Sequence, residues 1–190
     1  GSGFEAIKKG LDEVGNVFVG REFLENGKVE GISSTVADDL FRMPGVDYVI
    51  IEADGAAGRP LKAPAAHEPV IPRSVTCVIA LMGLEALGKP LGPDTVFRPA
   101  LFKALTGLEE GDILNPEGLA RAFDGKAGLF KNTPASARRM VFLNQSDIFP
   151  DDRTAQDMAR HLIETHRFIE RVVLGSFRKN EFISIHQEGV

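Results

Sequence analysis

The spacing of apolar residues predicts three amphipathic helices. In residues 4–14 apolar side chains recur three or four positions apart, so that they line one helical face. The same spacing occurs in residues 34–43, where Ser33 or Ser34 is placed to cap the first turn. Residues 152–166 carry a third stripe, with acidic residues at the expected helix start.

Other apolar stretches are typical of strands. Continuous runs rich in β-branched residues predict strands buried on both faces, at residues 48–51, 75–80, 139–143 and 171–175. Residues 182–186 alternate in character, which predicts an edge strand. An Asn-Gly pair between two apolar stretches predicts a hairpin in residues 17–32.

Strands that alternate with helices predict an α/β fold, with three layers (α/β/α) around a mainly parallel sheet. We expect residues 1–190 to form a single domain. A helical, loop-rich excursion is expected at about residues 84–135, because Arg98-Pro99 and Asn115-Pro116 each mark a helix start.

Polar residues follow three of the predicted strands. Glu52 and Asp54 come after residues 48–51, Asn144 and Asp147 come after residues 139–143, and Ser176 comes after residues 171–175. Parallel strands end on the same side of a sheet, so these side chains should converge where open α/β sheets bind ligands. The alternative is a turn at Asp54, a solvated Glu52, and Asn144 and Asp147 as a strand end and a helix cap.

Carboxylate oxygens at this position are good ligands for Mg²⁺, and Mg²⁺ in turn binds nucleotide phosphates. Glu52 and Asp54 are therefore candidate catalytic residues, and Asp54 is the candidate metal ligand.

The loop over residues 55–72 holds four prolines, which favour a stiff, extended conformation. It also carries Arg59, Lys62, His67 and Glu68. Charged residues on a stiff loop beside a carboxylate-tipped strand indicate a substrate or partner loop. The alternative is a proline-rich connector whose charges face water. Further along the chain Arg98, Lys126 and Lys131 either bind anions or belong to a solvated face.

Residues 52–72 contain E-A-D-G, R-P-L-K-A-P and H-E-P-V-I-P in succession. This succession resembles the signature of the selenium-dependent hydroxylase accessory protein family (YqeC). Weaker matches follow, at residues 97–99, 107–112, 128–131 and 144–147. The family is similar to P-loop NTPases of the class that includes metallochaperone GTPases for urease and hydrogenase maturation. The resemblance implies a nucleotide-dependent role in maturing selenium-dependent molybdenum hydroxylases, with Mg²⁺ and GTP or ATP as cofactors of the intact protein.

GTPases of that class carry Asn-Lys-x-Asp where this chain has Asn144-Gln145-Ser146-Asp147. The resemblance therefore makes Asn144, Asp147 and Ser176 candidates for nucleotide binding, and a carboxylate such as that of Asp147 can accept two hydrogen bonds from guanine. Gln145 stands where that class has lysine, which leaves guanine selectivity open. Ser176 lies where that class closes over the base. No stretch reads G-x-x-x-x-G-K-[ST]. The resemblance places such a loop before Gly1, so either the front of the domain is missing from this chain or this member lacks it. We therefore expect NTPase activity in the intact protein and none in this chain alone.

Composition and charge narrow the classes of protein to which this chain can belong. Apolar residues make up 43% and charged residues 26%, which is typical of a soluble globular protein. The net charge of −5 argues against a broad nucleic-acid-binding face. No apolar run approaches the roughly 20 residues of a membrane span, and no signal peptide is recognisable. The single cysteine, Cys77, lies in an apolar run and fits a small core residue in a reducing cytoplasm.

Two functions from different classes remain open at this stage. In the first, the chain is the body of a P-loop NTPase, and the loop over residues 55–72 responds to the γ-phosphate. In the second, it is a non-catalytic module that presents this loop to a cofactor or a client protein, either a molybdenum hydroxylase or another maturation protein.

Overall fold

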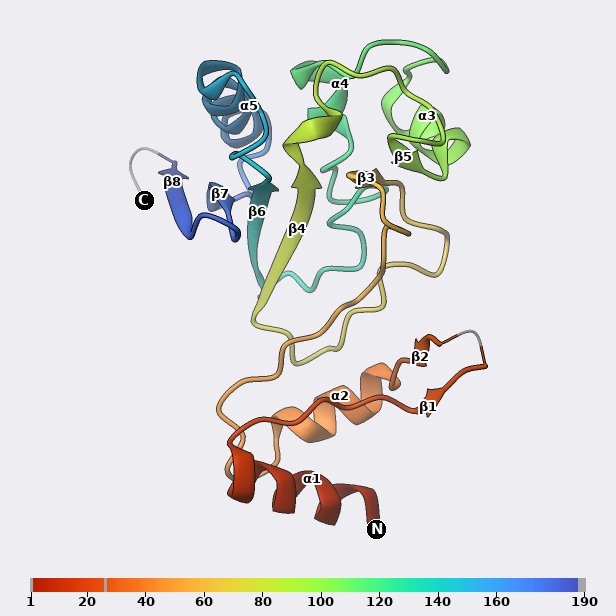
Figure 1. The fold of residues 1–190 in the computed structure, drawn as a ribbon, viewed down its shortest axis with the longest axis vertical. Coiled ribbons are helices and arrows are strands. Elements are labelled where there is room, and N and C mark those ends of the chain that lie inside the picture. The colour runs from red at the N-terminus through yellow and green to blue at the C-terminus, as the bar shows by residue number, and fades with distance from the viewer. Residues whose placement is uncertain (1, 26, 188–190) are drawn as a thin grey trace. The chain divides into compact units, whose positions relative to one another are not determined.

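The computed structural model describes residues 2–25 and 27–187. It divides into two compact units, one made of Gly1–Glu52 with Ile71–Val75, the other of Ala53–Val70 with Thr76–Val190. Figure 1 shows the elements of each. Among the described residues, no helix is both long enough and apolar enough to span a membrane.

The first unit holds two helices and a short hairpin. Helix α1 (Ser2–Val14) and helix α2 (Ser34–Phe41) confirm the predicted helices. Strands β1 (Glu22–Phe23) and β2 (Val29–Glu30) pair antiparallel, which confirms the hairpin, although its predicted turn residue Asn26 lies outside the described residues. Ser33 caps α2 by accepting a hydrogen bond from the backbone N–H of Val36.

The predicted buried strand over residues 48–51 is wrong. These residues form no strand, and the side chains of Tyr48 and Ile50 are 87% and 96% exposed. The β-branched run indicates only that the segment could be buried in a sheet. A strand also needs a neighbour that pairs with its backbone N–H and C=O groups, and no described strand pairs with this segment.

The second unit is built on a four-stranded sheet in the order β4-β6-β7-β8. Strands β4 (Cys77–Gly83), β6 (Arg138–Asn144) and β7 (Arg171–Ser176) are parallel, and β8 (Glu181–His186) is an antiparallel edge strand. A mixed α/β fold with mostly parallel pairing is thereby confirmed.

Between β4 and β6 the chain forms small elements. A 3-10 turn, η1 (Leu84–Ala86), precedes β5 (Val96–Phe97), which pairs in parallel with β3 (Leu61–Lys62). Helices α3 (Pro99–Thr106) and α4 (Pro116–Arg121) follow, and Asn115 caps α4 by accepting from the N–H of Gly118 at 2.8 Å. The β3–β5 pair was not predicted, because two-residue strands carry no periodicity.

The two faces of the sheet differ. One face packs against α5 (Asp152–Thr165) and buries alternate strand residues: Ala80, Met82, Val141, Leu143, Val172 and Leu174. On the other face Ile79 and Leu81 are 52% and 58% exposed. Phe142 on that face is buried and contacts the rings of Phe177 and Phe182. The described residues of this unit therefore provide a helical layer on one face of the sheet.

Candidate functional site

The ends of β4, β6 and β7 lie at the carboxyl edge of the sheet. The loop over residues 55–72 (the signature loop) reaches the same edge. Gly83 of β4 is in register with Asn144 of β6, which is in register with Gly175 of β7. The carbonyl of Pro60 accepts a hydrogen bond from the N–H of Gly83 at 2.8 Å. A Cβ at Gly83 would lie 2.3 Å from Oε1 of Gln145 and 2.9 Å from Cβ of Pro60. Only glycine therefore fits where the signature loop and the loop after β6 come together.

The loop after β6 holds two of the candidate nucleotide-binding residues. Asn144 and Asp147 are both half-buried, and within the described part of the chain neither side chain has a hydrogen-bond partner. The N–H of Ser146 donates to the carbonyl of Gly175 at 3.2 Å, which ties this loop to the end of β7. The third candidate, Ser176, is buried, and its hydroxyl accepts from the N–H of Lys179. Asn144 and Asp147 thus keep polar atoms available for a ligand.

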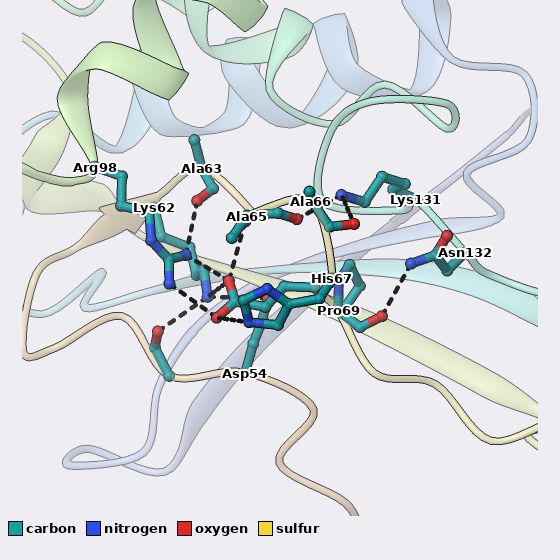
Figure 2. Close-up of polar contacts among 12 residues, drawn as sticks. Asp54, Lys62, Ala63, Ala65, Ala66, His67, Pro69, Arg98, Lys131 and Asn132 are labelled. Atoms are coloured by element: carbon teal, nitrogen blue, oxygen red, sulfur yellow. Dashed lines mark hydrogen bonds and ion pairs between the residues drawn. The ribbon is translucent and has the colours of Figure 1, made fainter.

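Glu68 is the centre of a cluster of charged side chains. Its members Asp54, Lys62 and Arg98 are labelled in Figure 2. The guanidinium of Arg98 binds both of its carboxylate oxygens, with Nη2 donating to Oε1 at 2.9 Å and Nη1 donating to Oε2. The ammonium of Lys62 donates to Oε2 at 3.0 Å, and the N–H of Ala65 donates to the same oxygen at 3.1 Å. Glu68 therefore receives four hydrogen bonds from three residues.

Lys62 joins a second carboxylate to the cluster. Its ammonium lies 3.0 Å from Oδ2 of Asp54 and donates to the carbonyl of Gly55 at 3.0 Å. Lys62 is only 5% exposed, although lysine side chains are almost never fully buried unless paired. The two cations Lys62 and Arg98 balance the two anions Asp54 and Glu68, so this partly buried group carries no net formal charge.

Hydrogen bonding from Arg98, above all, lowers the pKa of Glu68 from its ordinary 4.5 to about 2, although burial opposes the shift. The N–H of Ala65 and the ammonium of Lys62 act in the same direction as Arg98. The contact with Glu68 in turn raises the pKa of Arg98. Glu68 is therefore ionised at neutral pH, where it accepts hydrogen bonds but is poorly suited to general acid–base catalysis.

Residues from the excursion hold the signature loop in place. Arg98 directly precedes α3 and has a left-handed backbone conformation, with φ of 64°. Its guanidinium lies 4.4 Å from the ring centroid of Phe97. Lys131 donates to the carbonyl of Ala65 at 2.6 Å, and Asn132 donates to the carbonyl of Pro69 at 3.2 Å. Sequence reasoning noted Arg98 and Lys131 only as cations and missed this anchoring role, because no local pattern links residues 30 or 66 positions apart.

The predicted site residues are only partly brought together. Asp54, Lys62 and Glu68 share one cluster. Arg59 instead donates to the carbonyl of Pro93 at 2.6 Å. The side chain of His67 is 76% exposed, and its Nε2 lies 3.8 Å from Oε1 of Glu68. Glu52 belongs to the other compact unit, and its catalytic role together with Asp54 stays a prediction.

The residues present do not fit Mg²⁺ as they are arranged. Mg²⁺ requires oxygen ligands in near-octahedral geometry. One oxygen of Asp54 is bonded to an ammonium group, and both oxygens of Glu68 are bonded to cations. In the described ranges, 2–25 and 27–187, no three histidine, cysteine or acidic residues gather as a metal site. We therefore derive no step through a metal ion at Asp54.

Comparison with known proteins gives two matches. A family model described as "YqeC protein" matches residues 4–100. The "Uncharacterized protein YqeC" of Escherichia coli (strain K12) is 36% identical over 158 residues, covering 83% of this chain and 61% of that protein. The chain thus spans about three fifths of the length of the curated relative that it matches. No solved structure matches the chain.

Proposed function

Because the chain belongs to the YqeC protein family, we propose that it is the nucleotide-binding body of an accessory protein. One observation carries this proposal: the ends of β4, β6 and β7 converge, with the signature loop bonded to Gly83 at the same edge. In open α/β sheets, ligands bind outside the carboxyl ends of the strands. The proposed role in maturing selenium-dependent molybdenum hydroxylases comes from the family resemblance. The proposed cytoplasmic location rests on the single cysteine, which fits a reducing compartment.

The loop after β6 is the proposed base-binding element. The carboxylate of Asp147 accepts from the N1–H and the exocyclic amine of guanine, and the amide of Asn144 supports the loop. Support comes from the absence of protein partners for these two side chains within the described residues. In the intact protein, proposed to be a P-loop NTPase, Mg²⁺ binds together with the triphosphate, which supplies oxygen ligands of its own.

Isothermal titration calorimetry with GTP, ATP and CTP, in the presence of Mg²⁺, tests the proposal. It is carried out on this chain and on the full-length E. coli relative. We expect the longer protein to bind GTP or ATP more tightly than CTP. If the base is guanine, Asp147→Asn should weaken GTP binding by at least about tenfold and favour xanthosine triphosphate, because an amide can donate to the xanthine 2-oxo group.

The matched control is Asp157→Asn, a surface carboxylate of α5 paired with Arg160. This variant should bind all nucleotides as the wild type does. Equal affinity of Asp147→Asn and wild type for every nucleotide would reject Asp147 as a base contact. No binding of any nucleotide to either protein would reject the nucleotide proposal.

A non-catalytic binding function is the second candidate, favoured by the way the signature loop is held. Lys131 and Asn132 fix its backbone, while His67 is exposed and Val70 is 45% exposed. A client protein could contact these two residues, but not the buried Lys62. If this function holds, His67→Ala should weaken capture of a molybdenum hydroxylase in biolayer interferometry, and nucleotide affinity should be unchanged.

A further inference from the structure

The groups around Glu68 form a cradle for an oxyanion, defined here as the guanidinium of Arg98, the ammonium of Lys62 and the N–H of Ala65. Together they direct four N–H donors at one pair of carboxylate oxygens (Figure 2). Phosphate groups in protein binding sites accept hydrogen bonds from the same kinds of donor: a bidentate guanidinium, an ammonium group and a backbone N–H. The cradle is therefore chemically suited to ligands other than Glu68.

Each donor of the cradle is held by contacts that do not involve Glu68. Lys62 is also bonded to Asp54 and to the carbonyl of Gly55. Arg98 donates to the carbonyl of Ala63 at 3.3 Å and stacks on Phe97. The backbone next to the N–H of Ala65 is held by Lys131, which donates to the carbonyl of the same residue. Because these contacts remain when the Glu68 carboxylate is removed, we expect the donors to stay in place.

The cradle also lies on the segment that reaches the ligand-binding edge of the sheet. The carbonyl of Pro60 is bonded to Gly83 at the end of β4, and Lys62 lies two residues after Pro60. Removal of the Glu68 charge would leave two cations, Lys62 and Arg98, facing one anion, Asp54. The vacated cradle would then carry a net positive charge, which favours an anion over a neutral ligand.

We propose that this cradle is a binding site for a tetrahedral oxyanion, and that Glu68 occupies it as an internal substitute for a phosphate group. The phosphate belongs to a nucleotide or is free phosphate. Binding of free phosphate does not depend on the proposed function, whereas the nucleotide source rests on it. Exchange of Glu68 for phosphate frees the Glu68 side chain, while Lys131 and Asn132 keep the backbone of the loop in place.

The test measures binding of inorganic phosphate by calorimetry to the full chain and to Glu68→Ala. We expect the variant to bind phosphate at least about tenfold more tightly than the wild type, because its own carboxylate no longer competes. Adding Arg98→Ala to Glu68→Ala should abolish this binding. Glu85→Ala, which removes a carboxylate paired with Lys89 outside the cluster, should leave phosphate affinity at the wild-type level.

Two results would overturn the inference: a folded Glu68→Ala protein that binds no phosphate at millimolar concentration, or binding that survives the loss of Arg98. Circular dichroism and thermal unfolding establish that each variant is folded. If Glu68→Ala does not fold, a second experiment replaces calorimetry on this variant: Arg98 of the wild type is modified with phenylglyoxal, and mass spectrometry measures the modification. Protection of Arg98 by phosphate would support the cradle, and equal modification with and without phosphate would reject it.

Nucleotide titrations separate this inference from the proposed function. Phosphate binding by Glu68→Ala without nucleotide binding by any form would retain the cradle and reject the nucleotide proposal. Nucleotide binding that requires Asp147, but is unaffected by Arg98→Ala, would retain the nucleotide proposal and reject a nucleotide as the source of the phosphate in the cradle. Guanosine, which lacks phosphate, should bind equally to wild type and Glu68→Ala.

Discussion

Glu68 shows how one carboxylate can organise a loop. Its hydrogen bonds come from Lys62, Ala65 and Arg98, so it joins the start of the loop, its middle and the residue before α3. Removing one partner of a buried ionic group leaves the others uncompensated. The charge on Glu68 therefore contributes to stability as well as to the shape of the cradle.

Glu68→Gln should destabilise the chain by about 2 kcal/mol at neutral pH, since hydrogen bonds to charged groups contribute about 1.5–3 kcal/mol. Folding lowers the pKa of Glu68 from 4.5 to about 2. The stabilisation is therefore present above pH 4.5 and is lost as the pH falls toward 2. Urea unfolding of wild type and variant, compared at neutral pH and at about pH 3, measures this difference.

The control is Glu164→Gln on the exposed surface of α5, which should change the free energy of unfolding by less than about 0.5 kcal/mol at either pH. A Glu68→Gln difference that stays constant down to pH 3 would contradict an ionic origin, and would point to packing of the side chain instead.

Among the elements, those with complete local signals were predicted and those that depend on distant neighbours were not. Strands β6 and β7 and helix α5 were predicted to within a residue or two, because apolar runs and cap residues mark them. Residues 48–51 carry the same strand signal, but no partner strand exists among the described residues. The same holds for the candidate site. The strand ends that form it were predicted from the sequence. The anchoring of the signature loop by Arg98 and Lys131 was not, because it depends on how residues 84–135 fold.

Gly83→Ala tests whether the two loops meet at the end of β4. The added methyl group would overlap Gln145 and Pro60, and overpacking costs about 1–3 kcal/mol. We expect lower thermal stability, with faster hydrogen exchange in the signature loop. Gly92→Ala is the matched control, because nothing lies within 4 Å of its Cβ position. If both variants unfold alike, the close approach at Gly83 is not rigid.

On the scale of the whole molecule, the second unit exposes apolar side chains on one face of its sheet. Ile79 and Leu81 of β4 lie on the same sheet face as Phe182 of β8, which is 46% exposed. Large exposed apolar patches on soluble proteins favour association. They contribute little to the stability of the isolated chain, because their side chains remain largely in water.

Leu81→Lys should therefore reduce self-association at high protein concentration and change the free energy of unfolding by less than about 0.5 kcal/mol. Sedimentation velocity over a range of concentrations measures the association. Ile113→Lys serves as the control, since Ile113 is similarly exposed at 54% but lies outside the sheet. Equal association of wild type and Leu81→Lys would show that this face does not self-associate.

The path of the chain between the two units gives the signature loop an unusual mechanical position. Residues 53–70 enter the second unit from Glu52 and return to the first unit at Ile71. The segment is thus tethered at both ends to the first unit, while the bond between Glu68 and Arg98 fastens its middle to the rest of the second unit. Tension applied through the first unit would act on both tethers at once, and the ionic bonds at its middle would bear the load.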